Sequence, residues 1–297
     1  MVLKSGSLFP AQTVSEIFSK VNGHSTLAKL SAQTPIPFAG TTAFVFNLEG
    51  NAQIVGEGEQ KKAGEAKFET KVIKPVKIVY QARVTDEFVH CSEEKQLKYL
   101  KSFIDGYAKK IAEAFDIAAI HGLEPKSLED ASFKSANSFD GLVTANVVQF
   151  DAAKIDENID TAVSMITTNG GEVSGLALSP VAGSALGKIK VNGVAQYPEF
   201  RFGQNPEAFY GMLSDVNKTL LTKGGSAKAN HALVGDFANS FKWGYAENIG
   251  LEIIEFGDPD QTGRDLKAYN EVCLRTETYI GWGIMDSDAF ARVEATA

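Results

Sequence analysis

Residues 92–121 carry a single, unbroken helical pattern. Apolar side chains recur every three or four positions on one face, and lysines line the opposite face. Ser92 is placed to cap the start of the helix, while Gly122 and Pro125 end it. At 1.5 Å per residue the helix is about 45 Å long, so we expect a spine laid along a sheet; an ordinary amphipathic helix of an enzyme domain is the alternative. The apolar stripe consists of Leu97, Leu100, Ile104, Tyr107, Ala108, Ile111, Ala114, Phe115 and Ala118.

Two extended runs precede this helix, at residues 43–55 and 67–84, and in both of them apolar and polar residues alternate. A charged, glycine-rich stretch at residues 56–65 separates the runs, as expected for the tip of a long β-hairpin. A two-stranded hairpin has no core of its own and is marginal in water. We therefore expect it to project as a limb that a neighbouring molecule covers. The alternative is a hairpin that folds back on its own domain.

The remaining chain reads as a mixture of helices and strands. Helices are expected at residues 156–168 and from Pro180 to residue 188, where Ser179 is placed as the N-cap. Short strands are expected at 175–179, 212–221 and 231–235, followed by strands at 241–245, 251–256 and 269–284. We expect the spine helix to bury Leu97, Leu100, Ile104, Ile111 and Phe115 against a sheet that contains Val272, Leu274 and Ile280.

Composition narrows the class of protein. The chain has 297 residues, 44% of them hydrophobic and 22% charged, which is typical of a soluble globular protein rather than a disordered one. Two cysteines, Cys91 and Cys273, do not make a disulfide framework. The formal net charge of −8 argues against a protein that grips nucleic acid, although not against one that encloses it. No apolar run has the length of a membrane span or of a signal peptide.

The sequence presents no set of residues typical of an active site. His90 and Cys91 are neighbours, but adjacent residues on an extended segment point to opposite faces and cannot readily form a nucleophile–base pair. Asp258, Asp260 and Asp265 crowd one loop without the spacing of a calcium site, so a solvated acidic loop is favoured. We predict no catalytic, cofactor-binding or metal-binding residues. The histidines stand apart from one another at His24, His90, His121 and His231.

The order of several short motifs resembles the major capsid proteins of tailed bacteriophages, which share the Hong Kong 97-type fold, over nearly the whole chain. These motifs are Leu8-Phe9-Pro10, Ser25-Thr26-Leu27-Ala28-Lys29-Leu30, Val55-Gly56-Glu57-Gly58-Glu59, Lys74-Pro75-Val76-Lys77, Ala112-Glu113-Ala114-Phe115-Asp116, Leu178-Ser179-Pro180, Val234-Gly235-Asp236-Phe237, Leu274-Arg275-Thr276-Glu277 and Asp288-Ala289-Phe290. Each motif is weak alone, and their shared order carries the resemblance.

The resemblance implies an α+β fold of the Hong Kong 97-like capsid type. Its expected parts are an N-terminal arm, an extended β-hairpin loop, a peripheral domain with the long spine helix, and an axial α/β domain. In chain order these are the arm at 1–42, the hairpin at 43–86, the peripheral domain at 87–150, the axial domain at 151–265, and closing strands of the peripheral domain at 266–297.

The resemblance also implies a function. The chain is expected to self-assemble, through pentamers and hexamers, into the icosahedral shell of a phage virion that encloses double-stranded DNA without sequence-specific binding. Synthesis in the bacterial host cytoplasm, a separate scaffolding protein, a portal and decoration proteins are further expectations, and no membrane is involved. An encapsulin, a nanocompartment shell with the same fold around an enzyme cargo, is the alternative, followed by a soluble α/β enzyme.

In that family the hairpin lies across a neighbouring subunit. The expected intersubunit contacts are therefore the charged residues of the hairpin tip, Glu57, Glu59, Lys61, Lys62 and Glu65. Some members also join a hairpin lysine to an asparagine as an isopeptide. Lys61, Lys62 or Lys67 could donate to Asn270, beside Tyr269, with Glu271 or Glu277 nearby. The register of these pairs is not fixed by the sequence, and self-crosslinking is the disfavoured alternative.

Overall fold

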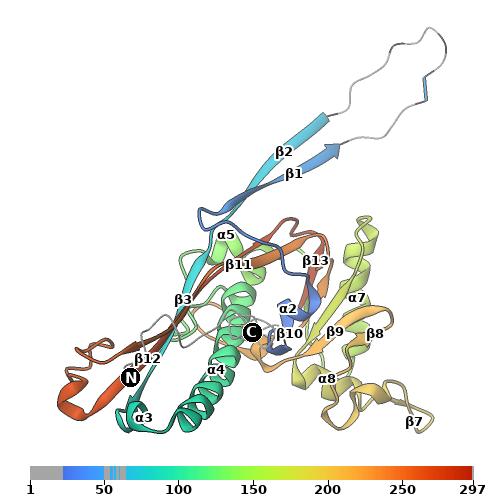
Figure 1. Cartoon of the computed structure of the whole chain (residues 1–297). Helices are drawn as coiled ribbons and strands as arrows, with labels where there is room; N and C mark the ends of the chain where they lie inside the picture. The colour runs from blue at the N-terminus through green and yellow to red at the C-terminus, as the bar shows by residue number, and fades with distance from the viewer. Residues whose placement is uncertain (1–22, 50–53, 56, 58–59, 61–64, 296–297) are drawn as a thin grey trace.

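The computed structural model describes residues 23–49, 54–55, 57, 60 and 65–295. Figure 1 shows a body built from two sheets and a long helix, from which a two-stranded hairpin projects. The helices are α2 Thr26–Leu30, α3 Glu87–His90, α4 Glu93–Asp116, α5 Lys134–Asn137, α6 Phe139–Leu142, α7 Ile155–Thr168 and α8 Pro180–Leu186. Four short segments accompany them: the π-helix η1 Ile117–His121 and the 3-10 helices η2 Pro198–Gly203, which is kinked, η3 Lys218–Leu221 and η4 Lys267–Tyr269.

The predicted spine helix is confirmed. Helix α4 runs from Glu93 to Asp116 and continues as the π-helical turn η1 to His121. Gly122 ends it in the left-handed conformation, with φ of 65°, which a residue without a Cβ adopts at little cost. Ser92 occupies the N-cap position with an extended backbone, but its side chain makes no capping hydrogen bond.

A three-stranded antiparallel sheet lies under the spine helix, in the order β11-β12-β3. Leu100 packs against Val272 and Leu274 of this sheet, and Ile280 lies in the large core that also contains Ile104. The side chain of Leu97 lies outside the described residues, and the rest of the predicted stripe faces the predicted strand. Burial of apolar area drives this packing. The strands are β3 Val76–Thr85, β11 Phe241–Ile254 and β12 Glu271–Ile284.

The second sheet has six strands in the order β4-β13-β10-β5-β9-β8, and α7 and α8 pack on one of its faces. Side chains alternate across it: Leu176 and Leu178 of β5 point to the α7–α8 side, while Ala177 joins the core under the spine helix. The sheet is thus buried on both faces. Its strands are β4 Val147–Gln149, β5 Gly175–Leu178, β8 Ala208–Phe209, β9 Met212–Val216, β10 Asn230–Gly235 and β13 Phe290–Glu294.

The hairpin is shorter than predicted. Strand β1, Thr41–Glu49, pairs with β2, Glu65–Ile73, but Val76–Thr85 is strand β3 of the three-stranded sheet. The prediction that the return strand of the hairpin reaches residue 84 is therefore wrong. Pro75 lies at the break, where its missing N–H and fixed φ interrupt the ladder. The alternation continues across that break, and alternation does not reveal which strand is the partner.

Membership of the two sheets also differs from the predicted segments. Strand β4, before residue 150, and β13, after residue 266, belong to the six-stranded sheet, whereas β11 belongs to the three-stranded sheet although it precedes residue 265. The predicted boundaries at 86, 150 and 265 therefore do not separate the strands of one sheet from those of the other. The division into arm, hairpin, peripheral and axial domains stays a prediction. The strands expected at 241–245 and 251–256 are one strand, β11, with two register shifts.

The segment after α8 holds a small hairpin of β6, Lys190–Val191, and β7, Val194–Ala195, followed by η2. The motif Leu8-Phe9-Pro10 lies outside the described residues. Across the described ranges, none of the helices combines the length and the apolar character needed to cross a membrane.

Candidate intersubunit surface

The β1–β2 hairpin projects from the body as a limb, which confirms the prediction for the part of it that the structure describes (Figure 1). The two strands pair in register from Thr41 opposite Ile73 to Glu49 opposite Glu65. Within the described residues they form a sheet of their own and pair with no other strand. Val72 leaves 56% of its surface exposed, so an apolar side chain on the limb remains uncovered.

The root of the limb is fixed to the body by an apolar cluster. Ile36, Ile73 and Met285 are buried together at this point, and Ala43 and Val45 of β1 pack against them. Strand β12 makes room for the cluster with a glycine: a Cβ at Gly283 would lie 2.8 Å from Cγ1 of Ile73, closer than normal van der Waals contact. The limb therefore leaves the body from a fixed base.

The chain that leads into the hairpin lies along β11. The backbone N–H of Thr34 donates to the carbonyl of Trp243 at 2.8 Å, and Gln33 forms a parallel bridge with the same residue. A Cβ at Gly244 would lie 1.7 Å from the carbonyl oxygen of Thr34, so only glycine permits this approach. The connector is thus held by the same sheet that carries the spine helix.

Glu57, between β1 and β2, is the one predicted contact residue whose side chain is described. It is exposed, as is Ile54 three positions before it. Glu59, Lys61 and Lys62 lie outside the described residues, and for Glu65 only its backbone place in β2 is described. The role of these charges as intersubunit contacts therefore remains a prediction.

The acidic loop after β11 is an ion-pair site, not a freely solvated segment. Nη2 of Arg83 contacts Asp258 at 2.7 Å and also Asp260, while Nη1 lies 3.0 Å from Glu271. The hydrogen bond from Arg83 holds the pKa of Asp260 well below its usual range. Asp265 instead accepts from the backbone N–H of Lys267 at 2.9 Å. No group of side chains suited to a metal ion is found within the described ranges.

The residues considered for an isopeptide are engaged elsewhere or not described. Glu271 pairs with Arg83, and Oε2 of Glu277 lies 2.7 Å from Nζ of Lys77. Asn270 adopts a left-handed backbone with φ of 52° and accepts through its carbonyl from Asp86. The side chain of Lys67 lies outside the described set, so crosslinking stays untested.

Two buried carboxylates that the sequence did not reveal hold helix α2 in place. One is Asp116, at the end of the spine helix. The other is Asp215 of β9, which accepts from Oγ1 of Thr26 at 2.7 Å and from Nζ of Lys29 at 2.5 Å. In the sequence, a Ser-Thr pair at the start of a helix indicates an N-cap. It does not indicate which distant carboxylates the two residues contact.

Two of the histidines, His121 and His231, pack inside the body. His121 is fully buried, and its Nδ1 lies 2.9 Å from Oδ2 of Asp140 while Nε2 lies 3.0 Å from the carbonyl of Thr219. His231 stacks on Phe150 at 3.6 Å between ring centroids. A side chain with no exposed surface cannot reach a substrate, so the His121–Asp140 pair is a core contact.

His90 and Cys91 do not form a catalytic pair either. His90 is exposed at the end of α3, and the half-buried Cys91 accepts through its backbone carbonyl from Nε2 of Gln96 at 3.2 Å.

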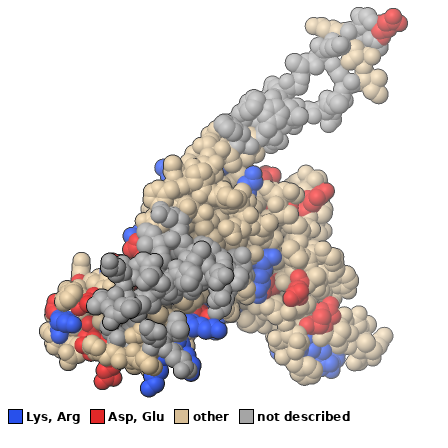
Figure 2. Space-filling model, viewed as in Figure 1, with Lys and Arg blue, Asp and Glu red and all other residues tan. Residues whose placement is uncertain are grey.

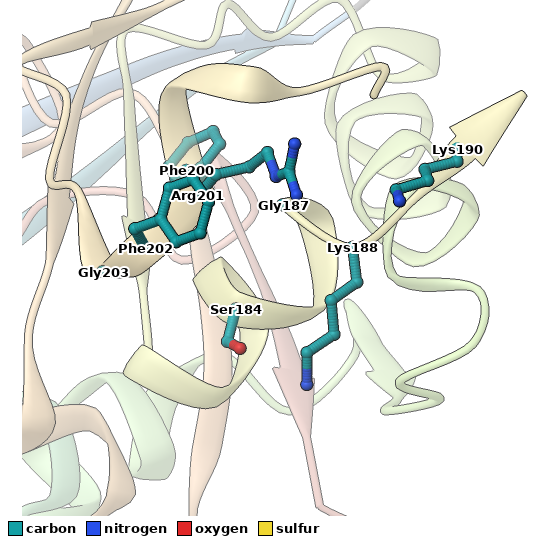
Figure 3. A pocket seen from close by; sticks show the side chains of 8 residues that line it. All are labelled: Ser184, Gly187, Lys188, Lys190, Phe200, Arg201, Phe202 and Gly203. Atoms are coloured by element: carbon teal, nitrogen blue, oxygen red, sulfur yellow. The ribbon is translucent and has the colours of Figure 1, made fainter. Parts of the chain in front are cut away.

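A hollow of about 440 Å³ lies beside α8 (Figure 3), and α8 lies at the end of the body away from the limb (Figure 1). Its polar side chains are those of Ser184, Lys188, Lys190 and Arg201, and the guanidinium of Arg201 lies 4.9 Å from the centre of the Phe202 ring. No carboxylate, imidazole or thiol is among the described residues that line it. The Ser184 hydroxyl therefore has no carboxylate or imidazole base beside it among the described lining residues, and the hollow does not resemble an active site.

Comparison with known proteins agrees with these features. Residues 5–295 match the model of the phage capsid family. A solved structure from Mycobacterium phage Ogopogo is 29% identical, covers 92% of each chain and superposes with a TM-score of 0.78. One from Gordonia phage Cozz is 24% identical over 94% of this chain and 87% of that one, with a TM-score of 0.70.

A third structure, the capsid of a native GTA particle, is 13% identical over 92% of this chain and 90% of that one, with a TM-score of 0.59, and shares the fold. No curated protein sequence matches significantly. The chain therefore belongs to the phage capsid family and is a Hong Kong 97-type major capsid protein, a structural rather than enzymatic subunit of the icosahedral shell of a tailed phage virion.

Proposed function

We propose that the β1–β2 hairpin is the limb through which copies of this chain hold one another in the shell. The observation that supports this is a pair of strands that leaves the body and pairs only with itself within the described residues (Figure 1). Because such a hairpin is marginal in water, a neighbouring copy that covers it supplies the missing stabilisation. The exposed Val72 is one apolar side chain that such a contact buries.

The charges of the tip set the register of this contact more than its affinity. Exposed charges contribute little to the stability of a single subunit, but a like-charged neighbour opposes docking and a complementary one guides it. The residues that we assign to this role are Glu57, Glu59, Lys61, Lys62 and Glu65.

Charge reversal tests the proposal. The double variant Lys61→Glu/Lys62→Glu should retain the circular dichroism spectrum of the wild type, yet form shells slowly or in aberrant shapes when followed by sedimentation at moderate salt. The matched control, Lys188→Glu/Lys190→Glu, makes the same change of charge on an exposed segment of the body. Normal shells at the normal rate from the tip variant would refute the assignment.

We further propose that the subunits form pentamers and hexamers and enclose double-stranded DNA. A scaffolding protein, a portal and decoration proteins are partners that rest on the family resemblance alone. The test is the content of purified particles: nuclease treatment of the intact particles, followed by phenol extraction, should recover double-stranded DNA of a defined length. An enzyme as the main content, with no DNA, would favour the nanocompartment alternative.

A further inference from the structure

A second hollow, of about 520 Å³, lies between the spine helix, helix α2 and the turn η3. The charged side chains that line it come from three separate parts of the chain, and the only carboxylate among its described lining residues is Glu113. We call this cavity the basic hollow, after the charged side chains that line it together with His24. Its lysines are Lys29, Lys109, Lys110 and Lys218.

The basic hollow has a positive balance of charge. Glu113 pairs with two lysines: Nζ of Lys110 lies 3.1 Å from Oε2 of Glu113, and Nζ of Lys218 lies 2.9 Å from Oε1. Lys29 pairs with the buried Asp215 behind the hollow. Burial and then the charges of Lys109 and Lys29 lower the pKa of His24, as expected where cations gather. This concentration of cations stands out in a chain whose formal net charge is −8.

The positive surface continues along the exposed side of the spine helix. Lys95, Lys98 and Lys101 are exposed there, and Lys109 and Lys110 follow, with Asp105 half-buried between them. At 1.5 Å per residue, the row from Lys95 to Lys110 is about 22 Å long. Figure 2 shows the blue side chains over the lower part of α4.

We propose that this row and the basic hollow contact the phosphates of packaged duplex DNA, so that this side of the spine helix faces the lumen of the shell. The inference rests on the proposed enclosure of DNA. A duplex presents a charge about every 1.7 Å along its axis, which suits a rigid row of lysines. A protein partner is less suited, because Val216 is the one apolar side chain among the described lining residues.

The overall negative charge keeps these contacts weak. A shell that bound DNA tightly over its whole surface would oppose the entry and exit of the genome, because each neutralised phosphate adds to the affinity. A local cluster of cations on an acidic subunit instead allows the outermost DNA to rest against the wall.

Lysine acetylation of intact particles tests the orientation. Filled particles and particles emptied of DNA are treated with the same small acetylating reagent, and modification is measured by mass spectrometry. Lys109 and Lys110 should be modified several-fold less in filled particles, whereas Lys188 and Lys190 should not change. Equal modification of Lys109 and Lys110 in both samples would overturn the proposal, including the case in which both are protected by neighbouring subunits.

Binding by unassembled full-length subunits tests the chemistry separately. Fluorescence anisotropy with a labelled duplex gives the affinity as a function of salt. Lys109→Gln/Lys110→Gln should weaken binding and lower the slope of log K against log salt by about 1.8, which is 0.9 for each of two phosphate contacts. The control Lys188→Gln/Lys190→Gln should leave the slope unchanged. An equal loss in both variants would show a general effect of charge and contradict the proposal.

Competition by poly-glutamate distinguishes the alternative partner. If poly-glutamate binds more tightly than the duplex, and depends on the same two lysines, the surface serves an acidic protein segment and the proposal is wrong. A particle that contains no DNA would instead refute the proposed function, and the anisotropy result would still stand by itself.

Discussion

The hydroxyl of Ser25 donates to Oδ1 of Asp116 over 2.6 Å and joins the start of helix α2 to the end of the spine helix. The backbone N–H of Thr26 donates to the other oxygen at 2.9 Å. The first N–H groups of a helix have no partner within the helix, so a buried carboxylate satisfies them and interacts favourably with the helix dipole. Because Asp215 of β9 holds the same turn, α2 is attached to both the spine helix and the six-stranded sheet.

Stability should depend on pH through Asp116. Burial, with a smaller effect of the Asp215 charge, raises the pKa of Asp116 from 3.8 to about 7. The folded state therefore holds this proton more tightly than the unfolded state does. The stabilisation is complete below pH 3.8 and is lost as the pH rises through 7, at up to about 1.4 kcal/mol per pH unit.

Replacing Asp116 with asparagine should remove this dependence. Chemical denaturation from pH 5 to 8 should show a free energy of unfolding that falls with pH more steeply in the wild type than in Asp116→Asn. Asparagine does not titrate, but its Nδ2 cannot accept the hydrogen bonds that a carboxyl oxygen accepts. The variant should therefore be less stable overall, and the readout is its flatter dependence on pH. Parallel curves for the two proteins would contradict the assignment.

The spine helix depends on Ile111, which is 1% exposed in the core that it shares with Trp243 and Trp282. Ile111→Ala should lower the free energy of unfolding by about 2–5 kcal/mol, because it removes buried area and leaves a cavity. Lys101→Ala, on the exposed side of the same helix, should change it by less than about 0.5 kcal/mol. Denaturant titration measures both, and a fully stable Ile111 variant would argue against the packing.

Two glycine substitutions should have opposite effects. Gly244→Ala places a Cβ 1.7 Å from the carbonyl of Thr34, so the connector must move and stability should fall by about 1–3 kcal/mol or more. Gly106→Ala lies within α4 with no atom within 4 Å of the new Cβ, and it should stabilise the helix by about 0.5–1 kcal/mol. Thermal unfolding followed by circular dichroism should show a lower midpoint temperature for Gly244→Ala and a higher one for Gly106→Ala than for the wild type.

Arg83 should order the loop at residues 258–265. Arg83→Gln leaves Asp258, Asp260 and Glu271 close together without their shared cation, so mutual repulsion should open the loop. Limited proteolysis with an enzyme that cuts beside acidic residues should cleave this loop faster in the variant. Arg201→Gln, whose cation rests on the Phe202 ring, is the control and should cleave at the wild-type rate.

Local patterns in the sequence predicted the elements that depend on neighbouring residues. The stripe from Leu100 to Phe115 fixed the face of the spine helix, and Ser179 caps α8 as expected by accepting from the N–H of Ala182 at 3.1 Å. Pairing between distant strands was not predictable in the same way. The run through Val84 alternates like a hairpin strand, yet it pairs with β12, because alternation assigns faces and not partners.

The candidate surface was predictable only in part. A glycine-rich, charged tip between alternating runs indicated a limb, which the structure confirms. The convergence of Ser25, Asp116 and Asp215 could not be predicted, since their partners lie far apart in the chain and meet only in the fold. Arg83 was missed for the same reason: its three carboxylates come from the opposite end of the sequence.

Electron cryomicroscopy of the purified particle tests the central claim most directly. The account predicts a closed icosahedral shell in which density for the hairpin, residues 41–73, lies across the body of a neighbouring subunit and covers Val72. A particle in which this hairpin stands free in solvent, or folds back onto its own three-stranded sheet, would contradict it.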